Sequence, residues 1–392
     1  MSVNFKANIW KFYLFKVFTS FALFVPIMVL FWQDNGLSFT EIMLLQSVFS
    51  ISVVLFEIPS GYFADIFGRK NALILASLAF PVAIFLYAIS HSFWIFLLGE
   101  ISMAFALSMI SGADAAFLFD TLKEVGRENE YTKFWGNATA IRFITIAVSN
   151  VVGGFLGQID FRLTFYAVLP FAFCLLPLSR SMIEPARYKL VIKKNYAFTL
   201  IKIIKTHLID NLKIRWLIIY SSIIYLFFQS ALWFYQPYMS LSGLEIIHFG
   251  LIFASFQIVA AISSKYASRI EKFFGRKTSL ILLMFIVATS NILLGSFVFT
   301  FSFLFAFLHQ FVRGFKLVVI SNYINSLVKS DVRATVLSGE RFIENIFFAI
   351  FIPFIGWFAD VYTLLQAFLL MGISVFVIGG VILIFMHRNK LF

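Results

Sequence analysis

Residues 61–70 read GYFADIFGRK and separate two apolar runs, 40–62 and 71–90. Each run is close to the roughly 20 residues that a helix needs to cross a hydrocarbon core about 30 Å thick. The polar stretch between them is short. It therefore predicts a tight connection between two helices that span a membrane.

Similar apolar runs recur along the whole chain, which has 392 residues, of which 61% are hydrophobic and 13% charged. An ordinary soluble domain carries about 25% charged residues, so we expect an integral membrane protein. Backbone groups in lipid must be satisfied within their own segment, and no β-barrel alternation appears, which predicts an all-α fold. About twelve spans are expected, at 9–32, 40–62, 71–90, 93–121, 134–157, 163–182, 215–239, 244–265, 278–299, 302–327, 335–358 and 362–386.

The gaps between these spans alternate in charge. Lys and Arg gather in every second gap, and they account for the net charge of +12. Under the positive-inside rule this pattern predicts a multi-pass protein of the cytoplasmic (inner) membrane with both termini in the cytoplasm. The basic residues thus indicate topology, and no nucleic-acid partner is expected. Cys174 is the only cysteine, which excludes a disulfide framework and a cysteine metal site.

The longest gap divides the chain into two halves. We expect a six-helix bundle at 1–182, a basic cytoplasmic linker at 183–214 and a second six-helix bundle at 215–392. Apolar residues at helical spacing within 196–212 predict an amphipathic helix on the inner leaflet.

The two halves also share sequence features. Arg142 and Gly157 are fifteen residues apart, as are Arg341 and Gly356, and the second pair follows the first by 199 residues. The GRK of residues 68–70 recurs at 275–277. Two copies of a six-helix unit predict a pseudo-symmetric transporter with its solute site between the halves.

The stretch 61–70 resembles the loop signature G-x-x-x-D-x-x-G-R-K of the major facilitator superfamily, in the loop where that family carries it. The resemblance implies that Arg69 pairs with Asp120, that Asp65 caps the eleventh span, and that this latch holds an outward-open state. The expected gating residues are Gly61, Asp65, Gly68, Arg69, Lys70 and Asp120.

The chain further resembles bacterial twelve-helix antiporters that exchange drugs or metabolites for protons. Residues 333–338, RATVLS, resemble the start of the eleventh helix in such exporters. The antiporter signature of the fifth helix, a Gly-Pro pair followed by Gly-Gly, is represented only by residues 149–154, SNVVGG, which lack both the first glycine and the proline.

Several ionisable residues fall inside the spans. A charge at mid-membrane costs about 2.5–3.5 kcal/mol on insertion scales, so such residues usually face a cavity or one another. We expect pairs of Asp114 with Arg142 and of Glu344 with Arg313 or Lys316, which could equally be purely structural. The candidate substrate and proton pathway comprises Lys16, Glu57, Asp114, Arg142, Gln229, Trp233, His309, Arg313, Lys316, Arg341 and Glu344. Among these residues, Glu57, Asp114 and Glu344 are the candidate proton carriers.

Motifs for covalent chemistry are missing from the sequence. No phosphate-binding loop, zinc motif or hydrolase elbow occurs, so we expect neither an enzyme nor a cofactor. The leading hypothesis is proton-coupled efflux of a drug-like compound or secreted metabolite, siderophores included, by a monomer in the lipid bilayer. Two alternatives stay open: proton-coupled uptake of a polar or anionic nutrient, and a membrane sensor or scaffold that does not transport.

Overall fold

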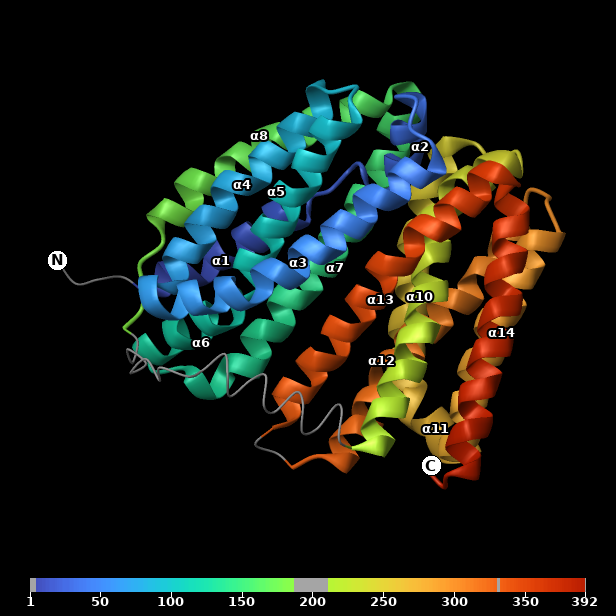
Figure 1. The fold of residues 1–392 in the computed structure, drawn as a ribbon. Helices are drawn as coiled ribbons and strands as arrows, with labels where there is room; N and C mark the ends of the chain where they lie inside the picture. The colour runs from blue at the N-terminus through green and yellow to red at the C-terminus, as the bar shows by residue number, and fades with distance from the viewer. Residues whose placement is uncertain (1–4, 187–210, 330–331, 392) are drawn as a thin grey trace. The chain divides into compact units, whose positions relative to one another are not determined.

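The computed structural model describes residues 5–186, 211–329 and 332–391. Within them the chain forms helices joined by short turns (Figure 1). The amphipathic helix predicted at 196–212 lies almost wholly outside the described residues. The elements are α1 (Lys6–Ser20), η1 (Val25–Ile27), α2 (Met28–Asp34), α3 (Phe39–Phe67), α4 (Arg69–Ile89), α5 (Phe93–Ser111), α6 (Asp114–Glu124), η2 (Glu128–Glu130), α7 (Tyr131–Ile159), α8 (Phe161–Ser181), α10 (Leu212–Leu241), η4 (Ile246–His248), α11 (Phe249–Ser296), η5 (Ser302–Phe305), α12 (Ala306–Leu327), α13 (Arg333–Val361) and α14 (Leu364–Arg388).

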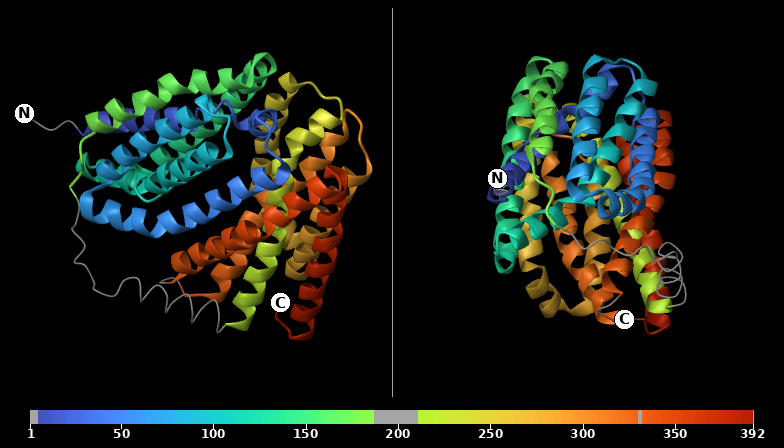
Figure 2. Two further views of the ribbon diagram at one scale, coloured as in Figure 1. Left: turned by 45° about the horizontal axis from the view of Figure 1, so that its top comes forward. Right: turned by 90° about the vertical axis from the view of Figure 1, so that its left-hand side faces the viewer.

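The helices form two compact units. Unit 1 comprises Met1–Gly36, Val48–Val191 and Ile246–Ala254, and unit 2 comprises Leu37–Ser47, Ile192–Glu245 and Ser255–Phe392. In unit 1, α4 packs against both α5 and α8; in unit 2, α10 packs against both α13 and α14 (Figures 1 and 2). The start of α3 thus groups with the second half of the sequence, and the start of α11 with the first half.

Eleven segments of the described residues are long and apolar enough to span a membrane, against about twelve predicted. The difference lies in one segment of 51 residues, Ile246–Ser296. Gly275 interrupts its helical geometry with φ 75° and ψ 168°. At 1.5 Å per residue such a segment would be more than twice the thickness of the hydrocarbon core. It therefore contains the two predicted spans, 244–265 and 278–299, and the all-α membrane fold stands.

The first predicted span is not one continuous helix. α1 ends at Ser20, a 3-10 turn follows at Val25–Ile27, and α2 completes the crossing. Pro26 lies in that turn. Proline lacks an N–H donor, and its ring clashes with the carbonyl four residues earlier, here Ala22, which accounts for the break.

The fourth predicted span is broken as well. α5 ends at Ser111, and α6 begins at Asp114. Gly112, at the break, packs so closely on α3 that a Cβ placed there would lie 3.1 Å from the backbone nitrogen of Gly61. The close packing at this point therefore requires the glycine at 112, whereas a Cβ on Gly61 would meet no atom within 4 Å.

Aromatic rings fill the interior of unit 1. The Phe165 ring lies 5.2 Å from that of Phe24 in a stacked arrangement and 4.6 Å from that of Phe31. All three side chains are buried. Such ring pairs add about 0.5–1.5 kcal/mol beyond the area they bury, so α8 is fixed firmly against the broken first span.

α7 packs through glycines on its neighbours in unit 1. A Cβ on Gly153 would overlap the carbonyl oxygen of Leu23, and one on Gly154 would lie 2.9 Å from the backbone nitrogen of Gly250. These glycines end the stretch 149–154, and they let backbone meet backbone. The remnant of the antiporter signature thus has a packing role in this structure.

Candidate functional site

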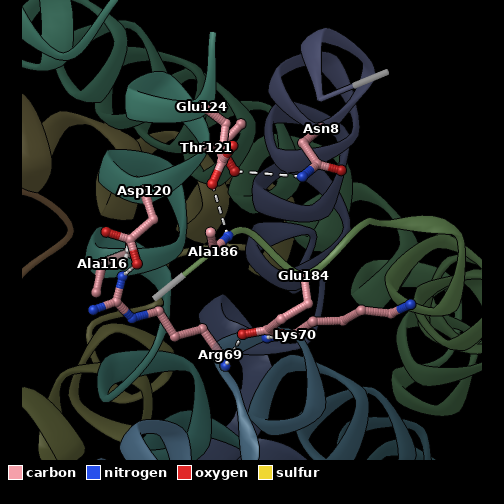
Figure 3. A network of polar contacts seen from close by, with 9 residues as sticks. All are labelled: Asn8, Arg69, Lys70, Ala116, Asp120, Thr121, Glu124, Glu184 and Ala186. Atoms are coloured by element: carbon pink, nitrogen blue, oxygen red, sulfur yellow. Dashed lines mark hydrogen bonds and ion pairs between the residues drawn. The ribbon is translucent and has the colours of Figure 1, made fainter. Parts of the chain in front are cut away.

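The stretch 61–70 ends in a sharp turn between α3 and α4. Gly68 has φ 115°, a backbone conformation that residues with a side chain rarely adopt, and α4 begins at the next residue. The first backbone N–H groups of a helix have no partner inside it, and they favour an anion. Here the Glu184 carboxylate accepts from Arg69 N at 2.9 Å and from Lys70 N at 2.7 Å (Figure 3).

The Arg69 side chain reaches α6. Its guanidinium forms an ion pair with Asp120 and donates to the carbonyl oxygen of Ala116 at 2.8 Å (Figure 3). The structure thus brings together two of the residues that the resemblance assigns to the latch. Asp65 lies exposed on α3, and the Lys70 side chain is half-buried.

Residues 182–186, which follow α8 and which we call the strap, are tied to the same end of unit 1. Ile183 N donates to Asn8 Oδ1 at 2.9 Å, and Asn8 Nδ2 donates back to the Ile183 carbonyl at 2.8 Å. Ala186 N donates to Glu124 Oε1 at 2.9 Å (Figure 3). The strap therefore links α1, α4 and α6, and the sequence analysis did not foresee it. The available signal was Glu184, an acidic residue in a basic linker.

Replacing Glu184 with alanine removes the cap of α4. We expect the free energy of unfolding to fall by about 1–2 kcal/mol, because loss of a helix cap costs about that much. Thermal unfolding of the purified protein in detergent measures the effect. Glu128→Ala, at an exposed glutamate, is the control and should leave stability unchanged. Equal stability of the two variants would mean that Glu184 does not hold α4.

A buried ion pair lies deeper in unit 1. Lys16 of α1 pairs with Asp114, the first residue of α6. Both side chains are buried, and the Lys16 ammonium also lies 5.2 Å from the centre of the Trp135 ring. The positive end of the α6 dipole stabilises the Asp114 carboxylate further.

The predicted pair of Asp114 with Arg142 is wrong. Arg142 is exposed on α7, and it forms no ion pair with any residue that the structure describes. Lys16 takes its place because the packing of α1 and α6 brings the two side chains together. Spacing along one helix cannot reveal that contact.

Unit 2 contains a second buried pair. Lys316 Nζ of α12 lies 2.5 Å from Glu344 Oε1 of α13, and both side chains are buried. Ser221 Oγ of α10 lies 2.7 Å from the same oxygen and 2.9 Å from Glu340 Oε1. Lys316 is one of the two partners predicted for Glu344. Glu340 and Ser221 were not among the predicted site residues, although Glu340 lies one helical turn before Glu344.

Arg313, the other predicted partner of Glu344, bonds elsewhere. Its guanidinium donates to Gln257 Oε1 at 2.9 Å and to Gln310 Oε1 at 3.3 Å. His309 shares one face of α12 with Arg313 and Lys316, because the three are four and three residues apart. It is fully buried, and its Nδ1 lies 2.7 Å from the Tyr235 hydroxyl. His309, Arg313 and Lys316 thus have three separate sets of partners.

The remaining candidates have less enclosed positions. Gln229 and Trp233 of α10 are half-buried, whereas Glu57 of α3 and Arg341 of α13 are exposed. None of these four residues forms an ion pair among the described residues. The buried charges of the predicted pathway are therefore concentrated in two clusters, one in each unit.

Comparison with known proteins decides the family. The family model described as Major Facilitator Superfamily matches residues 12–338, which is most of the chain. The chain belongs to the Major Facilitator Superfamily. As a member of this superfamily it is a multi-pass membrane transporter and not an enzyme.

Curated superfamily relatives match a shorter stretch. The chain is 24% identical over 155 residues to the quinolone resistance protein NorA of Staphylococcus aureus (strain MRSA252), which covers 40% of this chain and 39% of NorA. It is 28% identical over 151 residues to a Na(+), Li(+), K(+)/H(+) antiporter of Planococcus maritimus, covering 36% and 33% of the two chains. The matched stretch thus spans about two fifths or less of each relative.

Solved structures of superfamily transporters share the fold over nearly the whole chain. A mutant of the nucleoside transporter NupG has a TM-score of 0.82 at 15% identity, covering 97% of this chain and 99% of NupG. A bacterial homolog of the human lysosomal transporter Spinster has a TM-score of 0.73 at 14% identity, covering 99% and 98%. At these identities the likeness shows the fold alone.

Proposed function

We propose that this transporter exports a small organic solute, such as a drug-like compound or a secreted metabolite, in exchange for protons, by alternating access. The observation that carries the proposal is the buried lysine–carboxylate pair in each unit, Lys16 with Asp114 and Lys316 with Glu344. Charges at membrane depth are expensive, and they usually mark an ion or substrate pathway.

The chemistry of such a pair suits proton exchange. While the lysine is near, its charge keeps the carboxylate ionised; once the two separate in a dry site, the carboxylate binds a proton. Asp114 and Glu344 therefore remain our candidate carriers. Glu57 is exposed, and among the described residues it has no ionic partner of the kind that this mechanism needs.

The direction of transport is proposed from the relatives. NorA is named for quinolone resistance, and the Planococcus maritimus protein is named as a cation/proton antiporter. We extend export and proton exchange to this chain as a working hypothesis. We also propose that it is a monomer in the inner membrane, with both termini in the cytoplasm.

Uptake of a polar or anionic nutrient is the second candidate. Arg142 favours it, because this exposed arginine has no ionic partner among the described residues and could bind an anion. Lys316, by contrast, is paired, and the guanidinium of Arg313 is bonded to two glutamines. Two of the three cations that would serve uptake are thus engaged.

Transport into vesicles with an imposed pH gradient tests the proposal. With a fluorescent quinolone as the probe, one pH unit supplies about 1.4 kcal/mol per proton, or about a tenfold solute gradient for one-to-one exchange. We expect lipid vesicles that contain the protein to accumulate the quinolone while protons move in the opposite direction. Asp114→Asn and Glu344→Gln should each lose that roughly tenfold accumulation, whereas the exposed Glu128→Gln should keep it.

Three other outcomes have clear meanings. Accumulation driven by the opposite gradient would replace export with uptake. Unchanged accumulation in both variants would remove Asp114 and Glu344 from the coupling mechanism. Absence of flux for quinolones, nucleosides and peptides under either gradient would favour a sensor or scaffold.

A further inference from the structure

Among the described residues, only Ser221 and Lys316 make hydrogen bonds to the carboxylates of Glu340 and Glu344, and Lys316 bonds only Glu344. Ser221 Oγ is within hydrogen-bond distance of both Glu340, at 2.9 Å, and Glu344, at 2.7 Å. A serine hydroxyl has one hydrogen, so it can donate to only one of them. Glu344 also accepts from Lys316 at 2.5 Å, whereas Ser221 is the only hydrogen-bond partner of the Glu340 side chain among the described residues.

Each hydrogen bond of this cluster has one donor and one acceptor if Glu340 carries a proton. Its O–H then donates to Ser221 Oγ, the Ser221 hydroxyl donates to Glu344, and Lys316 neutralises the Glu344 carboxylate. All four side chains are buried within unit 2. With the proton the cluster has no net charge, whereas without it one unpaired negative charge stays inside a membrane-spanning segment, which is costly.

Among the residues that the structure describes, no cation forms an ion pair with Glu340. α10 contributes Ser221 to the cluster and, one turn on, Tyr225, whose ring centre lies 5.4 Å from the Lys316 ammonium. α12 contributes Lys316, which is bonded to Glu344. Arg313 of α12 bonds Gln257 and Gln310, and Arg341 is exposed. α14 has no titratable side chain between Leu364 and Met386.

We propose that Glu340 holds the exchanged proton, and that Ser221 relays it to Glu344. In this step the Glu340 O–H bond breaks as its proton passes to Ser221 Oγ, and the Ser221 hydroxyl proton passes to Glu344 Oε1. One proton has moved from Glu340 to Glu344, with no other reactant.

The relay explains how protonation could release Lys316. Once Glu344 is neutral, the Lys316 ammonium loses its counter-charge, while the net charge of the cluster stays the same. The lysine then becomes available to another anion, or loss of its ion pair with Glu344 weakens the contact between α12 and α13. The inference rests on the proposed proton exchange, but the presence of a proton on Glu340 can be tested separately.

Infrared difference spectroscopy of the full-length protein in lipid vesicles detects protonated carboxyl groups by their C=O stretch. At neutral pH we expect such a band in the wild type, lost in Glu340→Gln and retained in the exposed control Glu128→Gln. Ser221→Ala should shift the frequency of the band, because the carboxylic acid loses its acceptor. A band that is the same in the wild type and in both Glu340→Gln and Ser221→Ala would overturn the proposal.

A transport measurement separates this proposal from the proposed function. With the quinolone probe, Glu340→Gln should lose the roughly tenfold accumulation driven by one pH unit. It should keep exchange of labelled for unlabelled quinolone at equal pH, a readout that misfolding would abolish. If the band is lost in Glu340→Gln but the wild type shows no pH-driven flux, then Glu340 carries a proton and the proposed coupling to transport is wrong. Unchanged pH-driven accumulation in Glu340→Gln would refute Glu340 as the carrier while export stands.

Discussion

Lys16→Met should lower the free energy of unfolding by about 3–5 kcal/mol, because it leaves the buried Asp114 carboxylate without its partner. Methionine keeps the length and apolar stem of lysine but removes the charge. The carboxylate then lies in a membrane-spanning segment with the α6 dipole as its remaining support. Unfolding in detergent, followed by heat or denaturant, measures the loss.

The double variant Lys16→Met with Asp114→Asn identifies the cause. With both charges removed, most of the lost stability should return, since replacing a whole buried pair by neutral groups is often close to neutral. Lys6→Met, at an exposed lysine of the same helix, is the matched control and should change little. A double variant as unstable as the single one would attribute the loss to packing, and the pair would lose its electrostatic role.

Hydropathy predicted the helices well because lipid leaves the backbone few alternatives. Length and apolar content alone located the spans. Gly68, in the stretch predicted to be a tight connection, has a positive φ, and so does Gly275, where the GRK sequence recurs. The breaks in the first and fourth spans were missed. Pro26 was a visible signal for the first break, but a proline inside an apolar run does not tell whether a helix bends or ends.

Partners across helices were the least predictable feature of the candidate site. Helical periodicity shows which residues of one helix share a face, and the intervals of four and three residues place His309, Arg313 and Lys316 together. It does not show which helix lies opposite. The structure therefore supplied Lys16 as the partner of Asp114, and Ser221 as the bridge in unit 2. Glu184 was missed for the same reason, since its partners are backbone groups of a distant helix.

Gly153→Ala should be the most damaging small substitution in α7. The added methyl group would overlap the carbonyl oxygen of Leu23 and lie 2.8 Å from its carbonyl carbon. Backbone atoms cannot rotate away as a side chain can, so the two segments must separate, at a cost of about 3 kcal/mol or more. Thermal unfolding in detergent provides the measurement. Gly136→Ala, in the same helix with open space around it, should instead stabilise by about 0.5–1 kcal/mol. Similar melting temperatures for the two variants would mean that α7 does not pack on the broken first span through Gly153.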